Sequence, residues 1–91
     1  MPGTLQLPDT ATLATADALL GALQSAISGG EGALQIDAGA LTSFDTSAVA
    51  FLLQAQRVGQ AAGRPVSVHG APPKLLQLAQ LYGVDGLLNV A

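Results

Sequence analysis

Two hydrophobic periodicities alternate along this chain, and their order limits the folds that it can form. Three short segments have the alternation or the apolar content of β-strands: Thr4–Leu7, Ala33–Asp37 and Val66–His69. Three longer segments carry apolar residues three and four positions apart, which predicts helices: Thr15–Ser28, Asp45–Ala62 and Pro72–Tyr82. Strands and helices in this order form mainly parallel sheets joined by right-handed crossovers. We therefore expect one α/β domain over residues 1–91, a layer sandwich of a small, mostly parallel sheet with helices packed on it.

The ends of the predicted helices carry start and stop signals. Thr15 is expected to cap the first helix, and Gly29-Gly30 to end it. Pro72-Pro73 is expected to open the third helix, which Gly83 ends. One face of the second helix should be buried: Ala48, Leu52, Ala55, Gly59 and Ala62. The third helix should be filled by its apolar residues: Leu75, Leu76, Leu78, Ala79 and Leu81.

The remaining segments are shorter and less regular. Ala11–Leu13 is expected to add a second short strand, or the second half of a broken one, and Val84–Val90 to pack back onto the domain. Ala38–Phe44 is expected to be the one long irregular stretch. In an open parallel sheet, sites form in loops that follow the carboxyl ends of strands. A functional site is therefore expected where this loop meets the second helix.

Composition excludes several classes of function. Charged residues make up 10% of the chain, and three basic residues against six acidic ones leave no cationic surface for nucleic acid. With no cysteine and one histidine, the chain lacks the ligands of a disulfide or zinc site, and we expect no metal and no cofactor. The longest apolar run, Ala48–Leu53, is too short to span a bilayer, and Met1–Leu13 lacks the features of a secretory signal. We expect a soluble cytoplasmic protein that does not insert into membranes.

Asp45-Thr46-Ser47, at the start of the second helix, is the candidate site. Asp45 is a favourable N-cap, because its carboxylate can accept from the free amides of Ser47 or Ala48. The same sequence places two hydroxyls at the positive end of a long helix, where a phosphoryl group is electrostatically favoured. Gln54 and Arg57 fall with Ser47 on one broad polar stripe, which is either a solvated face or a docking surface.

Catalytic interpretations of the polar residues are weaker. Ser47, His69 and Asp45 are the residue types of a hydrolase triad, but no nucleophile-elbow motif accompanies them. Gly29–Gly32 lacks the Gly-Lys-Ser/Thr of a P-loop and is expected to be a turn. Asp37 and Asp45 could approach a cation only if the loop folded them together, and two carboxylates are too few for a hard cation. We therefore expect that the protein is not an enzyme.

The chain resembles the STAS domains over nearly its whole length. The most specific signature is a strand that ends in Asp37, followed by Phe44, Asp45, Thr46 and Ser47 at a helix start. The family usually continues with Gly, a branched aliphatic residue and often Gly, whereas this chain has Ala48, Val49 and Ala50. The resemblance implies a STAS-like layer sandwich that functions through protein–protein interaction.

Two branches of the family imply different roles for the hydroxyls. In MlaB-like subunits of phospholipid ABC transporters, the matching hydroxyl is Thr46, and Lys74–Val84 is similar to their closing helix. That branch implies binding to the cytoplasmic ATPase of a transporter that maintains outer-membrane lipid asymmetry, with the protein held at the inner membrane through its partner. In anti-sigma factor antagonists, a partner kinase phosphorylates the hydroxyl that matches Ser47. The resemblance favours the first branch, and Ser47 keeps the second one open.

Overall fold

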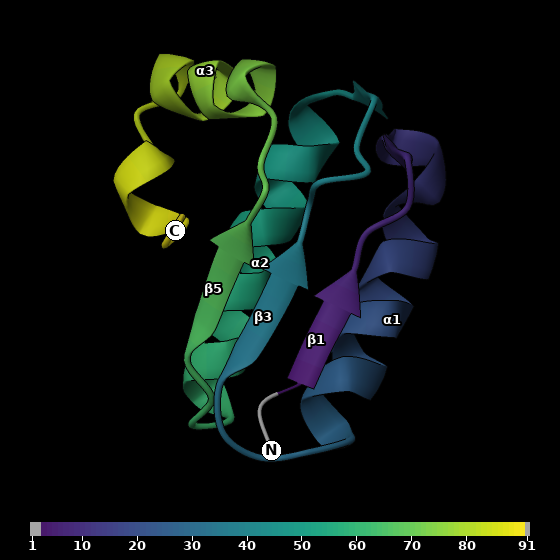
Figure 1. The fold of residues 1–91 in the computed structure, drawn as a ribbon, viewed down its shortest axis with the longest axis vertical. Helices are drawn as coiled ribbons and strands as arrows, with labels where there is room; N and C mark the ends of the chain where they lie inside the picture. The colour runs from purple at the N-terminus through teal and green to yellow at the C-terminus, as the bar shows by residue number, and fades with distance from the viewer. Residues whose placement is uncertain (1–2, 91) are drawn as a thin grey trace.

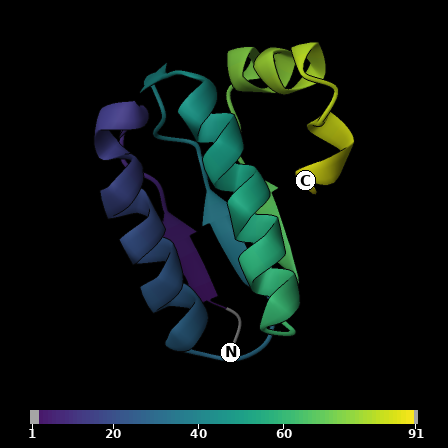
Figure 2. The ribbon, with the colours of Figure 1, turned by 180° about the vertical axis from the view of Figure 1, so that it is seen from behind.

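The computed structural model describes residues 3–90, and its main sheet contains three parallel strands in the order β1-β3-β5. The strands are β1 (Gly3–Gln6), β3 (Leu34–Asp37) and β5 (Val66–His69). Helix α1 (Ala16–Ser28) links β1 to β3, and helix α2 (Thr46–Ala61) links β3 to β5. Both links cross the sheet in the same direction, and both helices lie on the same face (Figure 1, Figure 2). The predicted α/β fold with a parallel sheet is confirmed.

The two faces of the sheet differ in chemistry because side chains alternate along each strand. Leu34, Ile36, Val66 and Val68 are buried beneath the helices. The residues between and beside them form the opposite face, which neither α1 nor α2 covers: Thr4, Gln6, Gln35, Asp37, Ser67 and His69. This open face is polar, so a parallel sheet that usually needs cover on both sides is stable with cover on one.

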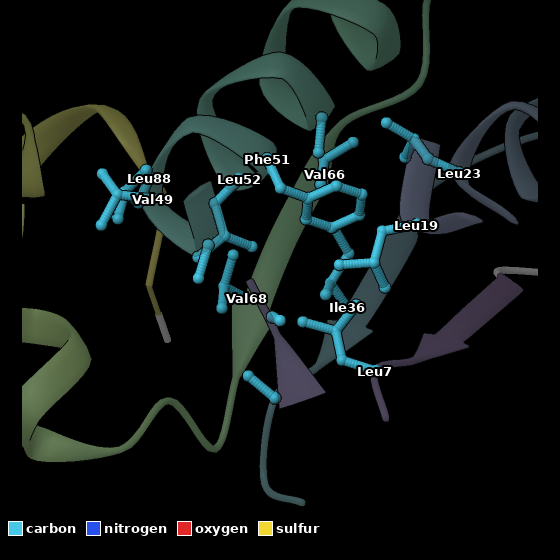
Figure 3. Packing of buried hydrophobic residues seen from close by; sticks show 14 of the residues in the cluster. Leu7, Leu19, Leu23, Ile36, Val49, Phe51, Leu52, Val66, Val68 and Leu88 are labelled. Atoms are coloured by element: carbon cyan, nitrogen blue, oxygen red, sulfur yellow. The ribbon is translucent and has the colours of Figure 1, made fainter. Parts of the chain in front are cut away.

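The core lies between the sheet and the two long helices (Figure 3). α1 contributes Leu19, Leu23 and Ile27, as the spacing predicted, while Leu20 is only partly buried. α2 buries Ala48, Leu52, Ala55 and Gly59, together with Val49 and Phe51. Ala62 was predicted on the same face but is exposed, because the helix ends at Ala61 and Ala62 is already its C-cap.

The end of α2 packs directly on the start of β5. A Cβ atom at Gly59 would overlap the Val66 side chain and would lie 2.7 Å from the Arg64 carbonyl oxygen. The Arg64 amide donates to the Gly59 carbonyl at 2.8 Å, which closes the turn between the helix and the strand. Gly59 therefore allows a closer approach of helix and strand than any side chain would.

Arg64 is a buried cation that sequence reasoning treated only as part of the charge count. Its guanidinium donates to the carbonyl oxygens of Ala26 and Ile27 at 2.7 and 2.9 Å, and to that of Gly32 at 2.8 Å. Ala26 and Ile27 lie in the last turn of α1, where carbonyls lack helical partners and a positive charge is favourable. Arg64 thus joins the end of α1 and the following turn to the α2–β5 connection.

The loop after β3 is more ordered than expected. It contains a short strand, β4 (Ser43–Phe44), which pairs in parallel with β2 (Thr10–Ala11) to form a second, two-stranded sheet. The prediction of an irregular Ala38–Phe44 stretch is therefore wrong at its end. The strand predicted at Ala11–Leu13 is also shorter, because Leu13 already belongs to a 3-10 helix, η1 (Leu13–Thr15).

Thr15 precedes α1 as predicted, but its side chain does not cap that helix. The Thr15 hydroxyl accepts from the Thr12 amide at 3.0 Å and donates to the Thr12 carbonyl at 3.1 Å. Because η1 leads directly into α1, Thr15 is already in a helical turn, and its hydroxyl bonds backwards instead of forwards.

The C-terminal third closes over the edge of β5. Helix α3 (Pro73–Leu81) follows β5 and buries Leu75 and Ala79, whereas Leu81 is exposed because it lies about 120° around the helix from Leu75. A short helix, η2 (Asp85–Leu87), then returns the chain to β5, where Val90 bridges Val68 and Leu88 is fully buried. The predicted return of the tail is confirmed.

Two glycine substitutions test the close packing of α2 on β5. Gly59→Ala should lower the free energy of unfolding by about 1–3 kcal/mol, because the methyl group has no space. Gly21→Ala is the matched control: Gly21 lies in α1 with no atom within 4 Å of the added Cβ, so alanine should stabilise by about 0.5–1 kcal/mol. Urea denaturation followed by circular dichroism measures both. Equal effects of the two substitutions would contradict the packing described here.

Candidate functional site

Asp45 connects the start of α2 to the chain that precedes α1. Its Oδ1 accepts from the Ser47 amide at 2.8 Å, which confirms the predicted N-cap. Its Oδ2 accepts from the Leu13 amide at 3.3 Å, a bond between residues 32 positions apart. The backbone hydrogen bond from Ser47 lowers the pKa of Asp45 by more than desolvation raises it, and smaller effects of the Ser47 side chain and the Leu13 amide also lower this pKa. The carboxylate is thus held ionised between two segments.

Thr46 and Ser47 follow in the first turn of α2 and face different surroundings. Thr46 is exposed. Ser47 is half-buried and lines a hollow of about 320 Å³ between the beginnings of α1 and α2, which we call the α1–α2 hollow. The rest of its lining is mainly apolar: Leu13, Ala16, Leu20, Ala50, Phe51 and Gln54. One turn of helix therefore presents a free hydroxyl and a second hydroxyl at the rim of an apolar depression.

The polar stripe predicted on α2 is divided by the structure. Gln54 is exposed and lines the α1–α2 hollow together with Ser47. Arg57 is also exposed but lines a different and larger depression of about 740 Å³, between the second half of α2 and the segment that contains η2. We call this the α2–η2 groove. The structure thus brings Ser47 and Gln54 to one depression and places Arg57 at another.

The other polar residues singled out in the sequence bond to neighbours in their own segments and do not join Asp45 and Ser47 in one site. The Ser67 hydroxyl and His69 Nε2 lie 2.9 Å apart on the open face of the sheet, whereas Ser47 and Asp45 belong to the beginning of α2. The Asp37 carboxylate accepts from the Gly39 amide at 2.9 Å and so stabilises the turn after β3. Within residues 3–90, no three His, Asp or Glu side chains come together in a way that could hold a metal ion.

Leu13 is the residue at this site that sequence reasoning missed. Its side chain is 77% exposed although it lies beside the apolar α1–α2 hollow. The sequence predicted that Leu13 lies in a strand, and the bond from its amide to Asp45 has no local signal because it joins residues far apart.

In the part of the chain that the structure describes, no helix has the length and hydropathy needed to cross a bilayer.

The lowered pKa of Asp45 predicts a pH dependence of stability. A carboxylate whose pKa is lower in the folded state stabilises the fold above its unfolded pKa, and this contribution is lost as the pH falls through the folded pKa. Stability should therefore fall below about pH 4, since the ordinary value is 3.8. Asp45→Asn keeps a good N-cap that does not titrate, so its stability should vary less over this range.

Urea denaturation at a series of pH values checks this prediction. Asp45→Ala is the comparison variant: it loses the cap as well as the charge and should unfold at a lower urea concentration than Asp45→Asn at neutral pH. Identical pH profiles for the parent and Asp45→Asn would contradict the role given to this carboxylate.

In a comparison with known families, the chain matches the family described as Mlab, STAS domain, over residues 2–89. Comparisons with curated proteins and with solved structures gave no significant match. The family match covers the sheet, the helices and the Asp45-Thr46-Ser47 turn described above. The chain belongs to the MlaB-type STAS domain family.

Proposed function

We propose that this protein is a non-catalytic subunit that binds and regulates the cytoplasmic ATPase of an ABC phospholipid transporter that maintains outer-membrane lipid asymmetry. Membership of the MlaB-type family supports the class of partner. The observation that carries the proposal is the first turn of α2, where Thr46 is free and Ser47 borders an apolar hollow. A protein bound in this way would be cytoplasmic and peripheral to the inner membrane.

The proposed docking surface follows the exposed side of α2 from its first turn. It consists of Thr46, Ser47, Gln54 and Arg57, with Asp45 holding the turn in place. The hydroxyl and amide groups beside the α1–α2 hollow, and the Arg57 guanidinium farther along α2, supply donors and acceptors, and the hollow can receive an apolar side chain of the ATPase. Exposed Leu13 at the rim of the hollow adds apolar contact area.

The rigidity of this surface indicates how such a subunit would act. The end of α2 is packed on β5 through Gly59, and its beginning is capped by Asp45, so the helix offers a fixed set of contacts. A bound subunit shifts the equilibrium between two conformations of its partner only as far as it binds one conformation more tightly than the other. The subunit would therefore favour the ATPase conformation that matches the docking surface, without carrying out chemistry itself.

An anti-sigma factor antagonist is the second candidate, and the position of Ser47 favours it. Ser47 lies in the first turn of α2, where the helix dipole favours a phosphoryl group. The same group would come close to the Asp45 carboxylate, which accepts from the Ser47 amide. A phosphate on Ser47 would therefore change the charge at the docking surface and could switch the binding of a kinase partner off.

Substitution of Thr46 tests the docking surface. Thr46→Ala should leave the melting temperature nearly unchanged, because Asp45 supplies the cap, while affinity for the co-purified ATPase should fall by about tenfold. Ser25→Ala, which removes an exposed hydroxyl from α1, is the matched control and should bind as the parent does. Calorimetry with the ATPase measures the affinities. Unchanged binding by folded Thr46→Ala would exclude Thr46 from the docking surface, and loss of its fold with unaltered binding by the molecules that remain folded would make Thr46 a structural residue.

The mass of the protein purified from its own organism separates the two candidate functions. The transporter role predicts an unmodified chain that co-purifies with an ATPase and a permease. Ser47→Asp should then keep the fold, since a negative charge is favourable at this helix end, and should weaken binding through desolvation at the interface. A stoichiometric phosphate on Ser47, removed by phosphatase, would instead establish the antagonist role.

A further inference from the structure

The two edges of the main sheet differ in how their backbone groups are bonded. The edge formed by β5 is closed by the C-terminal segment of the chain itself. The Val68 amide donates to the Asn89 carbonyl at 3.0 Å. The Val66 carbonyl accepts from the Gln56 and Asn89 side chains at 3.0 and 2.7 Å. The groups of β5 that point away from β3 therefore have partners within the fold.

β1 forms the other edge, which the described chain leaves open. The amides of Gly3 and Leu7 donate to carbonyls at either end of β3, at 3.1 and 2.9 Å. Because alternate residues of a strand direct their backbone groups to opposite sides, the N–H and C=O groups of Thr4 and Gln6 point away from the sheet. Both residues are exposed, and within residues 3–90 nothing bonds to these groups. β1 also lacks the charged residues and prolines that commonly protect an edge strand.

The helix layer behind the sheet extends past this open edge. Packed helices lie about 8–10 Å apart and neighbouring strands about 4.8 Å apart, so two helices cover about four strands. Here α1 and α2 cover a sheet of three strands. α1 lies outermost, beyond β1 on the side that faces away from β3 (Figure 1, Figure 2). The layer therefore provides cover for one more strand beside β1.

The side of α1 that extends past β1 carries small residues. Leu20 lines the α1–α2 hollow and so faces α2. Ala18 and Ala22 are each two positions from Leu20, about 200° around the helix, and therefore face away from α2. Both alanines are exposed, and Leu5, the β1 side chain on the helix side of the sheet, is only partly buried. A strand added beside β1 would lay side chains over the two alanines and complete the burial of Leu5.

We propose that the open edge of β1 binds an extended segment of a partner protein, which joins the sheet as a fourth strand. The backbone groups of Thr4 and Gln6 select the occupant, because only an extended backbone offers donors and acceptors that match them in one row. The side chains of this segment alternate, with apolar ones over α1 and polar ones beside the open polar face of the sheet. This surface is separate from the proposed ATPase-docking surface on α2.

A second copy of the chain does not fit this edge. Pairing of β1 with β1 about a two-fold axis would place the α1 helices of both copies on the same face. Because α1 already extends past β1, the two helices would occupy the same space (Figure 1). We therefore expect the edge to remain open in the purified chain.

Amide hydrogen exchange measured by NMR tests the proposal on the full chain. In the free protein, the amides of Leu5 and Leu7 should exchange slowly and those of Thr4 and Gln6 rapidly. A short peptide of alternating Thr and Val is the probe, and at saturation it should slow the exchange of Thr4 and Gln6 by about tenfold or more. A peptide of alternating Thr and Pro, which lacks half of the donors, is the control and should have no effect.

Variants locate the bound peptide. Gln6→Pro removes an outward N–H without breaking a bond to β3, so it should keep the fold and weaken peptide binding by about tenfold. Gln6→Ala keeps this N–H and should bind as the parent does. Ala22→Trp fills the space over α1 and should also weaken binding, and it tests the same edge even if Gln6→Pro does not fold. Gln24→Trp, at an exposed position about 200° around α1 from Ala22, is its matched control.

Three results would overturn the proposal. The first is unchanged exchange of Thr4 and Gln6 at saturating concentrations of the alternating peptide. The second is peptide binding that persists unchanged in folded Gln6→Pro or in Ala22→Trp. The third is slow exchange of Thr4 and Gln6 in the free chain that becomes fast on dilution, because a second copy would then occupy the edge. None of these results involves Thr46, so the ATPase test stands separately.

Discussion

Two crossovers that run the same way across a parallel sheet determine most of this structure. They place α1 and α2 on one face, so a single apolar layer forms between those helices and β1, β3 and β5. The other face is left without a helical layer and carries polar side chains at alternate positions. Because the strands are parallel and α2 begins after β3, the Asp45 turn comes to the carboxyl edge of the sheet, where sites form in folds of this class.

α2 is fixed at both ends by contacts of different kinds. Its beginning is held by the Asp45 carboxylate, which also binds the Leu13 amide, and its end is held by the close approach of Gly59 to β5. Arg64 extends this second anchor to the last turn of α1. The exposed side of α2 is therefore a rigid ridge between two depressions, which suits a subunit that acts through binding.

Local patterns predicted the parts of the fold that local physics decides. The main strands, the three helices and the Asp45 cap follow from periodicity and from end signals, and the structure has them. The errors come from contacts across the chain. Pairing of β2 with β4 orders the end of a loop that looked irregular, and η1 turns the Thr15 hydroxyl away from α1. Arg64 finds its carbonyl partners about 32 to 38 positions away, which no local pattern reveals. The sequence predicted the polar stripe on α2, but it could not predict the depressions that divide this stripe, because segments far away in the sequence form them.

We propose above that the protein binds an ATPase through the first turns of α2. Hydrogen–deuterium exchange of the full chain, with and without the co-purified ATPase, tests this binding mode most directly. We expect protection of the amides of residues 46–54 and of Leu13 when the ATPase is added, because these surround the α1–α2 hollow. Protection confined to α3 and η2, with exchange in the first turns of α2 unchanged, would contradict the claim.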